Sequence, residues 1–120
     1  MAKYQIDAML DAALAYISSN ATELYVCNAQ PTTRATAIST GLTGAATPSF
    51  TGPVNGDASG RKLTVDQEAD IPITSSGTAT HIALCSGTTL LYVTTSTSQA
   101  LTSGGTVTVP AWDIEIADAV

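Results

Sequence analysis

The sequence predicts a mainly β protein: a small antiparallel β-sandwich or barrel-like domain with one N-terminal α-helix. Helical periodicity is confined to the start of the chain, and short alternating apolar segments follow it. Turn signals rich in Gly, Pro and Asn separate these segments by roughly eight to twelve residues, which is typical of sandwiches and barrels. Twenty Thr residues, a β-branched type, strengthen the preference for strands.

A single domain is expected over residues 1–120. A chain of 120 residues buries a core without disulfides or metals, and no linker-like stretch divides it. We expect a helix over about 5–19 and a β-rich region over 22–117.

The helix is predicted from apolar residues that recur every three or four positions. Asp7 and Asp11 favour its N-terminal turns, and Ser18-Ser19-Asn20 provides a stop. Its apolar face must be covered by a sheet or by a neighbouring subunit. The residues that define this face are Ile6, Met9, Leu10, Ala13, Leu14 and Ile17.

The segments after the helix are shorter and less regular. Residues 31–47 are predicted to be an extended arm or weak strand, because Ile38 and Leu42 are their only bulky anchors. Residues 52–60 are predicted to be a loop, because Pro, Asn-Gly and Asp crowd together there. Strands are expected at Glu23–Asn28, Thr47–Thr51 and Arg61–Val65.

The second half alternates more clearly. Pro72 places the first of its strands at a sheet edge or a bulge. Ala79, His81, Ala83 and Cys85 are expected on one face of the second strand. The expected strands are Ile71–Thr74, Thr78–Cys85, Thr89–Thr95, Thr106–Val109 and Trp112–Ile116, with Thr97–Leu101 leading to a turn at Ser103-Gly104-Gly105.

The charge composition indicates what the surface suits. Only 12% of residues are charged, about half the usual share, so hydroxyl groups cover much of the surface. Such a surface favours packing against copies or partners, because few charges must be desolvated. Four basic residues and a net charge of −6 argue against nucleic-acid binding. No apolar run is long enough to span a membrane.

Few residues suggest chemistry. Cys27 and Cys85 end apolar runs and are expected to be buried free thiols. His81 is the only histidine, and an extended strand would hold it roughly 13 Å from Cys85, too far for a catalytic dyad. The basic pair Arg61–Lys62 is interpreted as a strand-edge charge rather than a ligand site.

Acidic and aromatic residues complete the search. The stretch 66–70 contains three acids and is expected to be a solvated loop rather than a Ca²⁺ site. Asp113 and Glu115 are expected to face solvent. Trp112 with Tyr25 and Tyr92 would suit glycan stacking, although a Trp more often fills a core. We expect no enzyme, no cofactor and no metal.

Several runs resemble a family of small structural proteins of tailed bacteriophages. The first is Met9–Ile17, followed by Leu24–Thr33, with further matches at Gly60–Val65, Gly77–Leu84 and Ile116–Val120. This resemblance implies a virion protein, assembled in the host cytoplasm. Within the virion, it implies a capsid decoration (cement) protein that binds the major capsid protein and forms a homo-oligomer, commonly a trimer.

Two alternatives remain open: a tail or neck component, and a host-surface glycan-binding module displayed on the particle. For the decoration role, the N-terminal residues and the arm over 31–47 are expected to reach neighbours. The residues expected to make partner contacts are Tyr4, Gln5, Pro31, Thr32, Arg34 and Phe50.

Overall fold

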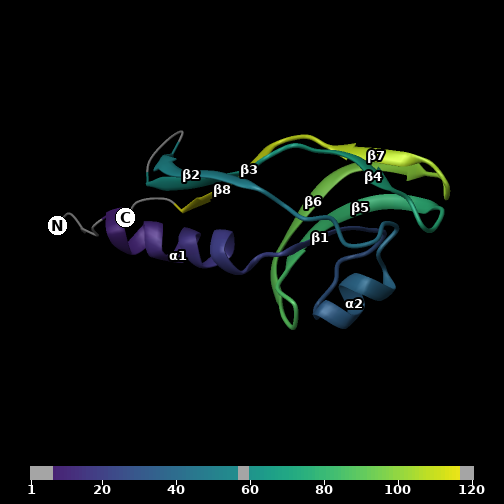
Figure 1. Ribbon diagram of the computed structural model, residues 1–120, viewed down its shortest axis with the longest axis horizontal. Helices are drawn as coiled ribbons and strands as arrows, with labels where there is room; N and C mark the ends of the chain where they lie inside the picture. Colours follow the sequence, from purple (N-terminus) through teal and green to yellow (C-terminus); the bar gives the residue numbers. More distant parts are fainter. Residues whose placement is uncertain (1–6, 57–59, 117–120) are drawn as a thin grey trace.

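The computed structural model describes residues 7–56 and 60–116 and is mainly β, with three antiparallel sheets and an N-terminal helix (Figure 1). The predicted fold class is confirmed. Tyr4 and Gln5 lie outside the described residues. The elements in chain order are α1 (Asp7–Asn20), β1 (Glu23–Cys27), α2 (Arg34–Ser39), β2 (Phe50–Asn55), β3 (Arg61–Val65), β4 (Glu68–Pro72), β5 (Gly77–Cys85), β6 (Leu90–Leu101), β7 (Thr106–Val109) and β8 (Trp112–Ile116).

The molecule is elongated, with extents of 54 × 26 × 23 Å, because two antiparallel pairs follow one another. β3 pairs with β8 and β4 pairs with β7. Val65 lies opposite Trp112 and Glu68 lies opposite Val109, so the two pairs form one interrupted ribbon. In Figure 1 this ribbon joins the half that contains α1 to the half that contains β5 and β6.

One hydrophobic core runs through both halves. It includes Leu14 of α1, Leu63 of β3 and Leu84 of β5, each 0% exposed. A smaller cluster lies on the other face of the β1-β5-β6 sheet, where Ala37 of α2 meets Cys27 and Cys85. The β1-β5-β6 sheet is therefore covered on both faces.

Helix α1 confirms the predicted helix but divides the predicted apolar face. Leu10 and Leu14 are buried against the core, whereas Met9 and Ala13 are exposed. The spacing allowed both sets, because apolar residues surround this helix on most sides. The sheet therefore covers only part of the predicted face, and coverage of the remainder by a neighbouring subunit stays a prediction.

The expectation of an extended arm over 31–47 was also wrong, because this stretch contains α2. Thr33 caps α2: its side chain accepts from the Thr36 amide, and the Thr36 hydroxyl accepts from the Thr33 amide at 2.8 Å. Two threonines thus form a capping box that more commonly contains Glu or Gln. After α2, isolated bridges tie the chain to its neighbours, as at Leu24–Ala46 and Cys27–Gly41.

Residues 52–55 of the predicted loop over 52–60 belong to strand β2, whereas Gly56 and Gly60 lie outside the strands, as predicted. A register shift between Thr51 and Val54 places Gly52 and Pro53 outside the ladder, so strand pairing tolerates the proline. Gly52 has φ +108, and a Cβ there would lie 3.1 Å from the Lys62 carbonyl oxygen. The predicted strand at Thr47–Thr51 therefore begins later, at Phe50, and continues to Asn55.

Three further predictions require correction. Residues 66–70 are not a free loop, because Glu68–Asp70 belong to β4. Arg61 and Lys62 do not mark a sheet edge, because β3 lies between β2 and β8. The two segments expected at Thr89–Thr95 and Thr97–Leu101 form the single strand β6.

Strand β5 departs from simple alternation at one point. A register shift between Ala79 and His81 places Ala79 in the same core cluster as Ile82 and Leu84. Ala83 and Cys85 lie in the cluster beneath α2, as the alternation predicted. The strands Arg61–Val65, Thr106–Val109 and Trp112–Ile116 have the predicted bounds, and Asp113 and Glu115 are exposed as expected.

Candidate interaction surfaces

Helix α1 presents an apolar surface to solvent, which we call the α1 face and define as Met9, Ala12, Ala13 and Tyr16. These residues follow helical spacing, and Met9 and Tyr16 are 57% and 62% exposed. The α1 face contains no charged residue. Larger exposed apolar patches mark sites of association, so the α1 face is a candidate interaction surface.

The second surface belongs to the half of the molecule that contains β5, β6 and β7. From Ile71 to Trp112 the chain has no Asp, Glu, Lys or Arg. Within this stretch β6 is the last strand of its sheet, and no described residue pairs with its outer edge. Natural edge strands are commonly protected by charges or Pro, and β6 has neither.

A groove of about 290 Å³ opens between β6 and the β7–β8 connection. Its floor is apolar, with Val26, Ile82 and Val107, and Trp112 forms one wall. The Trp112 ring stacks on Tyr92, with ring centroids 5.8 Å apart and an interplanar angle of 27°. Thr, Ser and Gln side chains of β6 form the opposite rim.

Two polar atoms at this groove are unsatisfied. Ser96 Oγ and Trp112 Nε1 are buried and have no hydrogen-bond partner among the described residues, and both residues line the groove. A buried polar group without a partner costs roughly 1–3 kcal/mol. Because both atoms are buried, the groove presents a mainly apolar surface to solvent.

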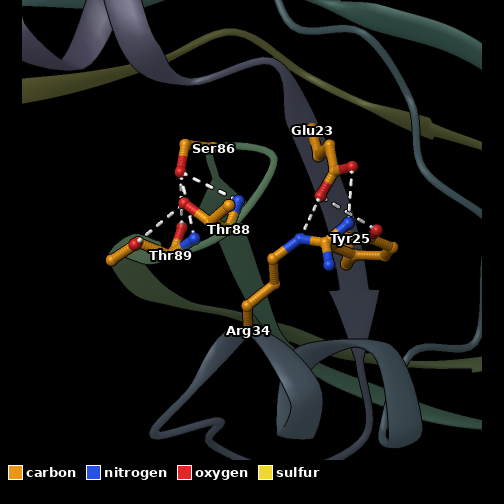
Figure 2. A network of polar contacts seen from close by, with 6 residues as sticks. All are labelled: Glu23, Tyr25, Arg34, Ser86, Thr88 and Thr89. Carbon is orange, nitrogen blue, oxygen red and sulfur yellow. Dashed lines mark hydrogen bonds and ion pairs between the residues drawn. The ribbon is translucent and has the colours of Figure 1, made fainter.

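The residues expected to contact partners differ in how exposed their side chains are. Thr32 is exposed, Pro31 is buried, and Phe50 is partly buried against the core. Arg34 is held within the protein: its Nε and a terminal nitrogen each donate to one oxygen of Glu23 at 2.9 Å (Figure 2). Among the four that are described, Thr32 alone has an exposed side chain.

The Arg34–Glu23 pair links α2 to the start of β1. Tyr25 adds a third bond, donating its hydroxyl to Glu23 at 3.1 Å. The Arg34 hydrogen bond holds the pKa of Glu23 below its ordinary value, with a smaller contribution from Tyr25. Burial and the Glu23 bond raise the pKa of Tyr25. Figure 2 shows the Ser86–Thr89 turn beside this pair, closed by bonds from two Thr amides to Ser86 Oγ.

The two cysteines are buried free thiols, as predicted. Cys27 lies opposite His81 and Cys85 lies opposite Glu23, so four residues of strand separate them. At about 3.3 Å per residue that is roughly 13 Å, well beyond the reach of a disulfide. Burial raises the pKa of Cys27, and raises the pKa of Cys85 to about 11. Neither thiol is arranged as a nucleophile.

His81 lies in the middle of β5 and makes a local contact. Its Nδ1 is 2.9 Å from the Thr80 hydroxyl. Cys27, opposite His81 on β1, instead directs its thiol to the Ala37 carbonyl oxygen at 3.6 Å. The sulfur–imidazole contact that a catalytic dyad requires is not formed between these residues.

The acidic stretch 66–70 is divided by the fold. Asp66 accepts from the Thr51 hydroxyl at 2.7 Å, whereas Glu68 and Asp70 line a separate hollow of about 370 Å³. Across residues 7–56 and 60–116, no three His, Cys, Asp or Glu side chains are grouped to hold a metal ion. Asp113 accepts from Thr64 at 2.8 Å and pairs with Lys62 at 3.5 Å.

Trp112 and Tyr92 come together as the glycan hypothesis requires, but Tyr25 lies in the cluster beneath α2. Both rings of the stacked pair are packed against the core. Each ring therefore has one face covered by the other ring, which leaves little aromatic surface for a sugar.

The sequence interpretation placed Met9 and Ala13 of the α1 face on an apolar side of the helix, but it missed the groove. The long uncharged stretch from Ile71 to Trp112 was a usable signal for the second surface. The groove itself has no sequence signal, because it depends on how β6 and the β7–β8 connection approach each other.

None of the described helices combines the length and the apolar character needed to cross a membrane. Comparison with protein families, with curated proteins and with solved structures finds no match to this chain.

Proposed function

We propose that this chain is a non-enzymatic structural protein of a tailed bacteriophage particle, a decoration protein that binds the major capsid protein and stabilises the shell. The resemblance of its helix and strand segments to such proteins suggests the role. The observation that carries it is the unpaired outer edge of β6, a strand of twelve residues without a charge.

An uncharged edge strand suits a shell protein because it can accept a strand from a neighbour. Strand addition provides main-chain hydrogen bonds, with little cost for desolvating charges. The same contact, repeated over many sites of a lattice, stabilises the assembly although each contact is modest. The elongated shape lets one molecule touch two neighbouring subunits.

The test uses shells that lack the protein. Purified wild-type protein is added back, and the temperature at which the shells break is measured by light scattering. We expect the wild type to raise this temperature. Ser98→Lys places a charge on the exposed outer part of β6 and should restore little, since lysine is a common protection of natural edges.

Thr102→Lys is the matched control, because it adds the same charge at an exposed position just beyond β6. It should restore shell stability as the wild type does. Shells whose breaking temperature is the same with and without the protein would contradict the proposal. If Ser98→Lys raises the breaking temperature as much as the wild type does, β6 is not part of the interface.

A tail or neck component would use the same kind of surface, and copy number separates it from a decoration protein. For the glycan-binding module, Trp112→Ala should abolish binding to a glycan array. The covered faces of Trp112 and Tyr92 make that the weaker candidate.

A further inference from the structure

Asn55, the last residue of β2, is followed directly by a glycine. The other asparagines of the chain, Asn20 and Asn28, are each followed by an alanine. The backbone nitrogen that follows an asparagine can attack the side-chain amide carbon. Glycine allows this attack most readily, because it has no Cβ to obstruct it and reaches many backbone conformations. Among the three asparagines, Asn55 therefore has the greatest intrinsic tendency to deamidate.

The reaction requires only water as a co-reactant. The Gly56 nitrogen forms a bond to Asn55 Cγ, the bond between Cγ and Nδ2 breaks, and the Gly56 amide proton leaves with Nδ2 as ammonia. Water then opens the cyclic imide at either of its carbonyl carbons. The product is an aspartate at position 55, or an isoaspartate in which the main chain runs through Cγ.

The fold holds both reacting groups in other contacts. The Asn55 side chain is exposed to solvent, and its Oδ1 accepts from a terminal nitrogen of Arg61 at 2.8 Å. The Gly56 N–H donates to the Gly60 carbonyl oxygen at 2.9 Å. The Arg61 guanidinium also donates to the Pro53 carbonyl oxygen at 3.2 Å, so it draws the Asn55 amide back along β2 and away from Gly56.

We propose that Asn55 is a spontaneous deamidation site that Arg61 keeps unreactive in the folded protein. Attack requires the bonds from Arg61 and to Gly60 to open together, so the rate follows the population of this locally open state. A hydrogen bond from a charged donor lowers such a population by about tenfold or more. The proposal concerns this chain alone and does not depend on a role in a phage particle.

Deamidation at this site acts on the attachment of α1. Arg61 pairs with Asp11 of α1, with Nε 2.7 Å from Oδ1. A new carboxylate at position 55 competes with Asp11 for the same guanidinium. An isoaspartate also lengthens the main chain at the point where Asn55 lies opposite Arg61 in the β2–β3 ladder. Both products therefore weaken the contact between α1 and β3.

The experiment follows deamidation of the purified protein by peptide mass spectrometry during incubation at mildly alkaline pH, in buffer and in guanidinium chloride. A sample digested at the start corrects for deamidation during digestion. In the denaturant, Asn55 should deamidate faster than Asn20 and Asn28 in the same chain. In buffer, Asn55 should deamidate more slowly than in the denaturant, by about tenfold or more.

Arg61→Ala removes the donor to Asn55, so in buffer Asn55 should deamidate about three- to tenfold faster than in the wild type. Lys62→Ala is the matched control, because Lys62 is the next residue of β3 and pairs with Asp113 instead. This control should deamidate at the wild-type rate. Circular dichroism establishes that each variant is folded. If Arg61→Ala does not fold, Arg61→Lys takes its place, because it keeps the charge but loses the planar donor fork.

Equal rates of deamidation for the wild type in buffer and in denaturant would overturn the proposal, and so would a folded Arg61 variant that deamidates at the wild-type rate. If Asn55 is no faster than Asn28 in the denaturant, Asn55 is not a deamidation site. Ion-exchange chromatography separates the deamidated form by its additional negative charge. Amide hydrogen exchange over α1 should be faster in this form, and unchanged exchange would contradict the effect on α1.

Discussion

Arg61 of β3 reaches across to Asp11 of α1, with Nε 2.7 Å from Oδ1, and so joins residues that are 50 positions apart. The same guanidinium donates to the Pro53 carbonyl oxygen at 3.2 Å and to Asn55 Oδ1 at 2.8 Å. One side chain therefore fastens the helix to two strands of the β2-β3-β8 sheet.

Removing this ion pair should loosen α1 from the sheet. Asp11→Asn should lower the free energy of unfolding by up to about 1 kcal/mol, because the pair is partly exposed to solvent. Arg61→Ala should cost more, since Pro53 and Asn55 also lose a donor. Urea unfolding measures both. Asp113→Asn, which affects the longer ion pair with Lys62 at 3.5 Å, is the control, and a loss of stability in Arg61→Ala no larger than in that control would contradict the role of Arg61.

The two sides of α1 should respond differently to truncation. Leu14 is 0% exposed, so Leu14→Ala should destabilise the protein by about 2–5 kcal/mol. Met9 is 57% exposed, so Met9→Ala should change the stability by no more than about 0.5 kcal/mol. Thermal unfolding at a dilution where the protein is monomeric compares them. Similar losses of stability for both variants would contradict the orientation of α1 described above, in which Leu14 is buried and Met9 is exposed.

The threonine capping box should be a measurable source of stability for α2. Thr33→Ala removes the oxygen that accepts from the Thr36 amide, and should cost about 1 kcal/mol. Thr32→Ala is the matched control, because the neighbouring Thr32 takes part through its backbone amide. Amide hydrogen exchange over Arg34–Ser39 should speed up in the first variant only. Unchanged exchange in Thr33→Ala would show that the cap contributes nothing.

The buried cysteines should make the protein sensitive to alkali. The folded protein raises the pKa of Cys85 from 9.0 to about 11, so the native state holds this proton more tightly than the unfolded chain does. The contribution is fully present below pH 9 and is lost as the pH rises from 9 towards 11. Urea unfolding at several pH values should show a steeper alkaline decline for the wild type than for Cys85→Ala. If the free energy of unfolding falls equally with pH in the wild type and in Cys85→Ala, the raised pKa of Cys85 does not contribute to the alkaline decline.

Much of the fold could be predicted from the sequence, because local pattern and tertiary environment agree there. Thr106–Val109 and Trp112–Ile116 alternate cleanly, and both occur as strands with the predicted bounds. Leu10 and Leu14 carry the helical spacing that packs α1 against the core.

The errors have two physical causes: long-range pairing overrode local composition in β2, and an uncommon local capping signal was missed in α2. Gly52-Pro53 has strong loop character, yet a bulge lets β2 pair with β3 around it. The weak segment 31–47 gains its helix from a capping box made of two threonines, which is an uncommon signal. The groove beside β6 could not be predicted, because the residues that line it come from five strands and a connection.

The most direct test of the proposed structural role is the copy number of this protein in purified particles of the phage proposed to encode it, measured by quantitative mass spectrometry against the major capsid protein. The account predicts a fixed ratio, with a copy number comparable to that of the major capsid protein. Absence from the particles, or the few copies expected of a tail or neck ring, would contradict it.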